Sequence, residues 1–362
     1  MTFLFIPYAA AFVLVFAEWR GRLNRFRTQL AALPAWAWIG ALAVTYASQL
    51  LVVRAAALQT PRDLMIAAHG AALPIPVLLP GFPHADWYSA AFLLGGLVQT
   101  VALAELYRTG VSRTVLFAGA AVLTVMSVCA PGLTSFDLYG YVHDSLLGLA
   151  AYLPPYPPFR GEYHSFDLWF GGPTPTLYGP LWFPIVESVM SLGSTLLGKL
   201  VVYRLFSAAL VAVVLFLLRA LGQSRRMLAI VALNPALLFL TVANGHNDVL
   251  AIAIVLLAAC FAQRSLLLAA ATIALAGLIK LPYAVLGLPV LGPYGTQGRR
   301  AVASVVAIAA ALTLSWIGGG TGYFADFHRY SGRASADEFA RVVAVVAALC
   351  ALGIATLANR RL

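Results

Sequence analysis

The chain carries few charges: only 10% of its 362 residues are charged, whereas 62% are hydrophobic. A soluble domain carries about 25% charged residues, so this composition excludes a water-soluble globular protein. Cysteine is scarce too, because there are only three, Cys129, Cys260 and Cys350, and each lies in an apolar run. These positions exclude a disulfide framework and predict three buried, inert thiols.

Several sequence patterns are missing as well. The chain has no heptad seam, no low-complexity tract, no visible internal repeat and no glycine-rich phosphate loop. The formal net charge of +10 is high, but in so apolar a chain we expect the basic residues to set the membrane topology. We therefore predict no nucleic-acid partner.

Apolar runs near the roughly 20 residues that a helix needs to cross the hydrocarbon core recur from end to end. The first has no basic region before it and no small-residue cleavage site after it, so we expect a retained helix. We predict one all-helical membrane domain, 1–362, made of N-terminal helices (1–130), a polar loop (131–199) and C-terminal helices (200–362). The eleven predicted spans are Phe3–Ala17, Trp36–Val53, Trp87–Leu106, Val115–Ala130, Leu200–Leu218, Met227–Ala243, Val249–Ala262, Ser265–Ile279, Tyr283–Tyr294, Val302–Ile317 and Val342–Ala358.

Two further stretches, Asp63–Pro80 and Tyr178–Leu197, are apolar but interrupted by prolines and polar residues, so each can span or lie on the surface. If both lie on the outer surface, 14 of the 23 basic residues fall on one side of the membrane. Short basic loops face the cytoplasm. We therefore predict that the N-terminus and the polar loop lie outside the cell and the C-terminus inside.

The polar loop places a carboxylate at the outer membrane surface. Asp137 is followed by Leu138, Val142, Leu146 and Leu149 near helical spacing, which indicates a helix lying on the membrane. A carboxylate at a helix N-terminus is favoured by the helix dipole. Asp137 can therefore be a helix cap or a catalytic group, and the residues alone leave both interpretations open.

Aromatic side chains crowd the same stretch on both sides of a proline-rich turn at 153–158. They can form an interfacial aromatic belt or a platform for the apolar C–H faces of sugar rings, and composition does not separate the two. These aromatic residues are Tyr139, Tyr141, Tyr152, Tyr156, Tyr163, Trp169, Tyr178 and Trp182.

Polar residues also interrupt two later junctions on the predicted outer side. His246, Asn247 and Asp248 follow Asn244 between two spans, and Lys280 ends another. Ionisable groups at the membrane edge are costly and usually line a cavity or a site. The structural alternatives are a polar network that packs two helices, for His246 and Asp248, and a snorkelling side chain, for Lys280.

Three other polar residues of this region are expected to play lesser parts. We expect Asp144 to face the loop instead of acting as a second base, and Glu187 to face solvent. His143 has no neighbours at the spacing of zinc ligands, so we predict no metal site.

The order of these motifs resembles membrane glycosyltransferases of the GT-C class. Within it, the order is similar to polyprenyl-phosphate-mannose-dependent α-mannosyltransferases of actinobacterial envelope synthesis. The resemblance covers roughly residues 130 to 290. It is carried by Asp137-Leu138-Tyr139-Gly140-Tyr141, Pro155-Tyr156, Tyr178 to Trp182, Gly245-His246-Asn247-Asp248 and Lys280-Leu281-Pro282.

The resemblance implies a GT-C type fold in a bacterial plasma membrane, with the active site on the extracytoplasmic face. It implies that a sugar, mannose first among the candidates, passes from a polyprenyl-phosphate donor to a lipid or glycan acceptor with inversion. One carboxylate, Asp137, then suffices as general base, and the family implies no metal and no other cofactor. Lys280, His246 and Arg329 are candidates to stabilise the leaving phosphate, and the remaining expected substrate-binding residues are Tyr139, Tyr141, His143, Asp144, Tyr156, Tyr178, Asn247 and Asp248.

Two other functional classes stay open. A carrier or flippase also places polar residues at broken helices, but its site must be reached from both faces. Here the polar residues map to the outer ends of spans, which favours chemistry at the surface. A structural subunit of an envelope complex would use the aromatic loop as an interface.

Overall fold

The computed structural model describes residues 33–59, 85–130, 137–152, 160, 163 and 178–333, with side chains described except at 55–59, 85–89 and 326–333. Within these ranges the chain is helical, as predicted, and forms no strand. The N-terminal helices are α3 (Ala35–Gln59), α5 (Ala85–Thr109) and α6 (Arg113–Val128). They are followed by α7 (Asp137–Leu147), η2 (Gly148–Tyr152), α9 (Trp182–Met190), α10 (Leu196–Ala220), α11 (Arg225–Ala232), α12 (Pro235–Leu238), η4 (Phe239–Ala243), α13 (Asp248–Ala262), α14 (Leu266–Ile279), α15 (Pro282–Leu286), η5 (Leu288–Leu291) and α16 (Gln297–Arg333).

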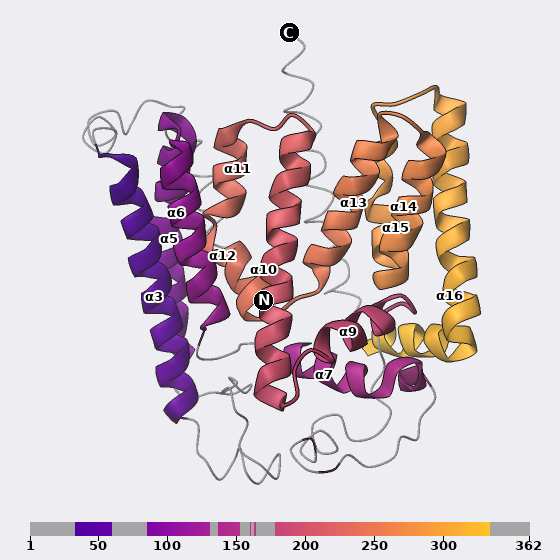
Figure 1. Ribbon diagram of the computed structural model, residues 1–362, viewed down its shortest axis with the longest axis horizontal. Helices are drawn as coiled ribbons and strands as arrows, with labels where there is room; N and C mark the ends of the chain where they lie inside the picture. The colour runs from indigo at the N-terminus through magenta and orange to yellow at the C-terminus, as the bar shows by residue number, and fades with distance from the viewer. Residues whose placement is uncertain are drawn as a thin grey trace.

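Long helices stand side by side, and α7 and α9 lie across one end of them (Figure 1). Four described helices are long and apolar enough to cross a membrane, namely α3, α5, α10 and α16. A fifth crossing results if α11 and the α12–η4 segment, bent by 49°, form one broken span. The chain is thus an all-helical membrane protein. The total of eleven spans stays a prediction, and Phe3–Ala17 and Val342–Ala358 lie outside the described residues.

Of the two stretches that the sequence allowed either to span the membrane or to lie on its surface, the structure describes one. Tyr178–Leu197 contains α9, whose nine residues rise about 14 Å and fall short of the roughly 30 Å hydrocarbon core. Asp63–Pro80 lies outside the described residues. The predicted span Tyr283–Tyr294 is two short helices, α15 and η5, which meet at Gly287.

Capping residues explain where several helices begin. The side chains of Ser112, Thr195 and Ser224 each accept a hydrogen bond from the backbone N–H three residues later, which satisfies one of the open donors of the first turn. Gly110 and Gly222, both at φ +80°, follow the ends of α5 and α10, where a left-handed residue favours glycine.

The segment before α13 departs from regular α-helix. Asn234 caps α12 with hydrogen bonds to two backbone N–H groups, and Pro235 occupies its first turn. The chain then continues as the five-residue π-helix η4. Single π turns are uncommon and are often found at functional sites. A turn at Gly245, φ +71°, leads into α13.

Two clusters of buried side chains hold the part of the molecule that carries the site. The first joins α3, α5 and α6 to α10 and η4, with Tyr46 and Phe239 among its members. The second joins α7, α9, α10 and α13 through Tyr141, Trp182 and Tyr203. Helix α10 belongs to both clusters, so it connects the N-terminal helices to the end where α7 lies.

Candidate active site

Asp137 is the first residue of α7, as the sequence predicted. The buried face of α7 includes Leu138 and Val142, whereas Leu146 and Leu149 are exposed. The predicted apolar row therefore packs against the protein only at the N-terminal end of the helix. This packing fixes the end that carries Asp137.

His246 contacts Asp137 across a long separation in sequence. Its Nδ1 lies 2.6 Å from Oδ2 of Asp137, and 13% of the His246 side chain is exposed compared with 35% for Asp137. The close approach depends on Gly245, where a Cβ would lie 3.0 Å from Leu138 and 3.3 Å from the ring of Tyr203. An accessible carboxylate is thus held by a more deeply placed imidazole.

An ion pair between a lysine and an aspartate lies beside this contact. Lys280 Nζ is 3.0 Å from Oδ1 of Asp248, and the Tyr283 hydroxyl donates to the same oxygen at 2.9 Å. Burial alone would raise the pKa of Asp248, but the charge of Lys280 and these hydrogen bonds hold that pKa below its ordinary value. Asp248 therefore stays ionised, and Lys280 already has a counter-ion.

The bridge between Tyr178 and α14 determines where Lys280 lies. Tyr178 and Lys280 form an isolated antiparallel bridge, and Gly179 N–H donates to the Ile279 carbonyl at 2.9 Å. A Cβ on Gly179 would lie 2.3 Å from the Leu278 carbonyl oxygen. Only glycine allows this approach of two backbones.

Four aromatic rings next to these polar contacts pack into one cluster: Tyr141, Tyr178, Trp182 and Tyr203. Ring centroids of Tyr141 and Trp182 are 4.7 Å apart, and those of Tyr141 and Tyr178 are 5.5 Å apart. Burial raises the pKa of Tyr141 and of Tyr178 well above the ordinary value, so both hydroxyls stay neutral. The Tyr141 hydroxyl accepts a hydrogen bond from Asn247 N–H at 3.1 Å.

Burial changes the interpretation of several predicted residues. Tyr139 and Tyr141 are fully buried, so in this structure they support the site and do not form an open platform for sugar. Asp144 is also buried and accepts a hydrogen bond from Trp182 Nε1 at 3.1 Å. Asp144 thus supplies the acceptor that a buried indole N–H requires, and its partner Trp182 belongs to the same predicted loop region, 131–199. His143 is buried, with Nδ1 3.7 Å from Oδ1 of Asp144.

Asn247 is buried without a side-chain hydrogen bond to the described part of the chain. Neither its amide nitrogen nor its amide oxygen has a partner among those residues. Exposed Glu187 faces solvent, as predicted. Tyr156 and the side chain of Arg329 lie outside the described residues. Across the described ranges no three His, Cys, Asp or Glu residues come together as a metal site requires.

Sequence reasoning missed Arg204, which is 2% exposed and lies in α10. Its Nη1 donates to the carbonyls of Val128 and Ala130 at 3.1 and 2.8 Å, and its Nε donates to the Ala243 carbonyl at 3.0 Å. The guanidinium thereby ties the end of α6, which precedes Asp137, to the end of η4, which precedes His246. The sequence did contain a signal for Arg204: it is an arginine inside an apolar run, and ionisable residues in such runs are costly and usually functional.

The described geometry brings Asp137, His246, Asp248 and Lys280 together at the end of the molecule covered by α7. A family model described as "Alpha-(1->6)-mannopyranosyltransferase, N-terminal domain" matches residues 87–297, which is more than half of the chain and contains all four residues. No curated protein and no solved structure matches the chain.

Proposed function

The chain belongs to the alpha-(1->6)-mannopyranosyltransferase family, and from that premise we propose that it transfers mannose from a polyprenyl-phosphate donor to a hydroxyl of a lipid-linked or glycan acceptor. The reaction takes place on the extracytoplasmic face of a bacterial plasma membrane, with inversion and without a metal. One observation carries the proposal: an accessible carboxylate, Asp137, is fixed by His246 at 2.6 Å.

The proposed step uses a single base. The acceptor hydroxyl attacks the anomeric carbon and passes its proton to Asp137, while the bond from that carbon to the phosphate oxygen breaks. The electron pair leaves with the polyprenyl phosphate. An inverting displacement needs one base on the side of the acceptor, and the 35% exposure of Asp137 leaves the carboxylate within reach of a bound hydroxyl.

His246 is proposed to position that base. With the proton on Nδ1, the imidazole donates to Oδ2 of Asp137 and restrains the carboxylate, so that the acceptor hydroxyl meets a preorganised group. Lys280 and Asp248 stand beside this pair. Because Asp248 already neutralises Lys280, we propose that the pair orients the donor and that Lys280 stabilises the phosphate only if it exchanges partners.

The experiment compares wild type, Asp137→Asn and Glu187→Gln with radiolabelled polyprenyl-phosphate-mannose and a lipid acceptor extract. Glu187→Gln is the matched control, since Glu187 is an exposed carboxylate on α9, which packs on α7. We expect the control to transfer label like wild type and Asp137→Asn to lose at least about 100-fold, the lower range of general-base catalysis. Equal transfer by all three proteins would leave Asp137 as a helix cap only.

The positioning role of His246 is tested with His246→Gln and His246→Phe. Glutamine can donate a hydrogen bond to Asp137, whereas phenylalanine cannot, so we expect glutamine to retain more turnover at unchanged donor KM. A loss equal in both variants would show that the imidazole does more than donate one hydrogen bond. A rise in KM alone would place His246 in donor binding instead.

A further inference from the structure

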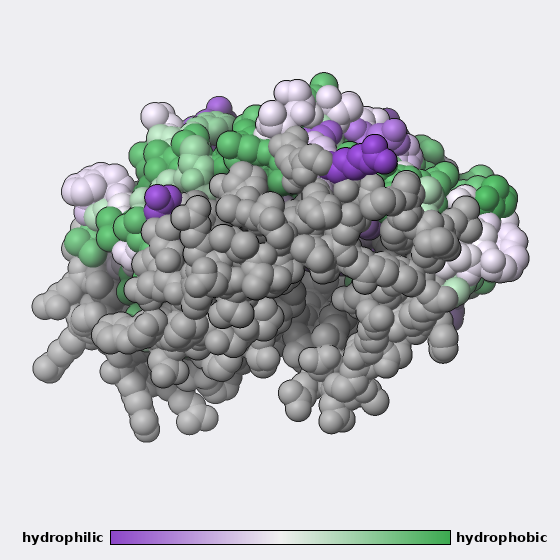
Figure 2. Space-filling view, turned by 90° about the horizontal axis from the view of Figure 1, so that it is seen from below, coloured by the Kyte–Doolittle hydropathy of each residue, from purple (hydrophilic) through white to green (hydrophobic). Residues whose placement is uncertain are grey.

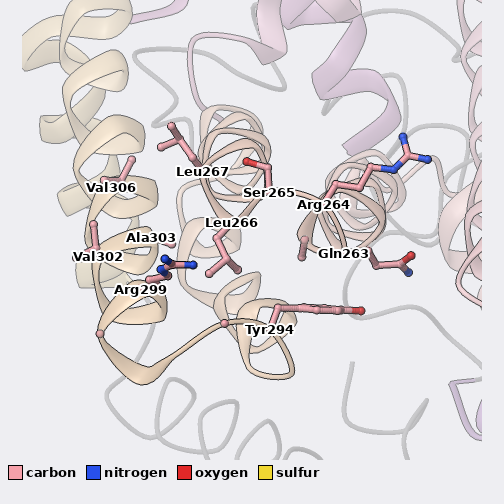
Figure 3. A pocket seen from close by; sticks show the side chains of 13 residues that line it. Gln263, Arg264, Ser265, Leu266, Leu267, Tyr294, Arg299, Val302, Ala303 and Val306 are labelled. Carbon is pink, nitrogen blue, oxygen red and sulfur yellow. The ribbon is translucent and has the colours of Figure 1, made fainter.

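A pocket of about 650 Å³ lies at the far end of α13 from the candidate active site. It is bounded by the turn between α13 and α14, the first turn of α14, the turn after η5 and the start of α16 (Figure 3). The 15 residues of α13 rise about 22 Å, so the pocket is separate from the site that holds Asp248.

The pocket is basic, and none of the described residues that line it is acidic. Arg264 and Arg299 line it, both are exposed, and neither forms an ion pair with any described residue. From Val249 to Ala325 the sequence contains no aspartate or glutamate. In Figure 3 the Arg299 side chain extends from α16 toward Leu266, whereas the Arg264 side chain points away from Arg299. A concave surface with uncompensated positive charge favours an anion.

The walls of the pocket are apolar and open toward the outside of the helices. Leu267 on α14 is 66% exposed and Val302 on α16 is 64% exposed, and Figure 3 places both beside the gap between these helices, with Val306 one turn further along α16. In a protein that crosses a membrane, exposed apolar side chains of this kind face lipid. A soluble anion would gain nothing from such a wall, whereas acyl chains would.

We propose that this pocket binds an anionic phospholipid of the membrane leaflet at this end of the protein. The phosphodiester lies beside Arg299, in the pocket that Arg264 also lines, and the acyl chains follow Leu267 and Val302. The Ser265 hydroxyl, which accepts a hydrogen bond from Leu268 N–H, retains its proton to donate to the phosphate. Basic pockets between membrane helices are known to take anionic headgroups.

The test measures lipid binding by the full-length protein in nanodiscs of phosphatidylcholine. Spin-labelled phosphatidylglycerol is the probe, and spin-labelled phosphatidylcholine is the neutral comparison. We expect wild type to prefer phosphatidylglycerol and Arg299→Gln or Arg264→Gln each to weaken that preference about fivefold, the effect of one basic residue at a membrane surface. Arg225→Gln, at an exposed arginine that begins α11, is the control and should leave the preference unchanged.

Two outcomes would overturn the proposal. An equal loss in Arg225→Gln would show that the whole basic end attracts anionic lipid without a specific pocket. Displacement of the labelled lipid by millimolar glycerol 3-phosphate would show a site for a soluble anion. Loss of the preference in Val302→Gln, with both arginines present, would in contrast support the acyl-chain wall.

Discussion

Replacing Arg204 by methionine should destabilise the protein, because its guanidinium makes three hydrogen bonds to carbonyls that lie at the ends of two other segments. Each such bond contributes about 1 kcal/mol net, so the three together stabilise the fold by about 3 kcal/mol. Unfolding entropy of about 2.1 cal/mol/K per residue over the chain converts this loss to a drop of about 4 °C in Tm. Thermal unfolding in detergent, followed by size-exclusion chromatography, measures the drop.

The matched control for this prediction is Arg219→Met, since Arg219 lies on the same helix but is exposed in its last turn. We expect Arg219→Met to unfold at the wild-type temperature. Arg204→Lys should lie between the two, because an ammonium cannot reach three carbonyls as the guanidinium fork does. If Arg204→Met unfolds no earlier than Arg219→Met, the reasoning about these bonds is refuted.

In the Arg204 variants we expect the transfer rate to fall by more than the lower Tm alone would explain. The two segments that Arg204 joins lead to Asp137 and His246, so their release alters the spacing of that pair. A misplacement of about 1 Å at a catalytic group can cost about 100-fold in rate. Transfer assays below the unfolding temperature measure this effect separately from Tm.

Three further substitutions test the surroundings of the site. Gly179→Ala should lower the free energy of unfolding by about 1–3 kcal/mol, because its Cβ would lie 2.3 Å from a carbonyl oxygen. An unchanged Tm in thermal unfolding would show that the bridge to α14 is unimportant. Trp182→Phe keeps an aromatic side chain but removes the indole N–H that donates to Asp144. We expect a loss of about 1–3 kcal/mol, visible as a lower Tm, and no loss if solvent donates to Asp144 in place of the indole. Tyr283→Phe removes a hydrogen bond that lowers the pKa of Asp248, so the pKa of Asp248 should be higher in the variant. Because the stabilisation from ionised Asp248 is lost as pH falls through this pKa, the variant should lose activity at a higher pH than wild type. Superimposable pH–rate profiles would contradict this.

The sequence predicted the helical class, the position of Asp137 at a helix start and the family motifs, because these depend on local composition and order. It did not predict the 2.6 Å contact between Asp137 and His246, which depends on how α7 packs against the turn before α13. It also did not predict the hydrogen bond from Trp182 to Asp144, because the two residues lie far apart along the chain. Arg204 was overlooked for the same reason: its three acceptors come from segments that only the folded chain brings together.

The exposed apolar residues on the long helices were also beyond a residue-by-residue prediction. Figure 2, which views the molecule from the end that α7 crosses, shows hydrophobic surface along the upper edge of the view, and α3, α10 and α16 each carry exposed large apolar side chains. Which of these residues faces lipid and which packs inside depends on helix rotation. Periodicity is a weak guide to that rotation where a helix is apolar on every side.

The π-helix η4 makes the contact between Asp137 and His246 sensitive to a change of a single residue in the length of the chain before it. A π turn holds one residue more than the α turn it replaces, so it is equivalent to an insertion within Phe239–Ala243. Deleting one residue there would restore regular α-helix and rotate the following chain by about 100°, carrying His246 away from Asp137. Homologous chains that keep this histidine should therefore also keep the length of the segment between Pro235 and Gly245, whatever amino acids fill it.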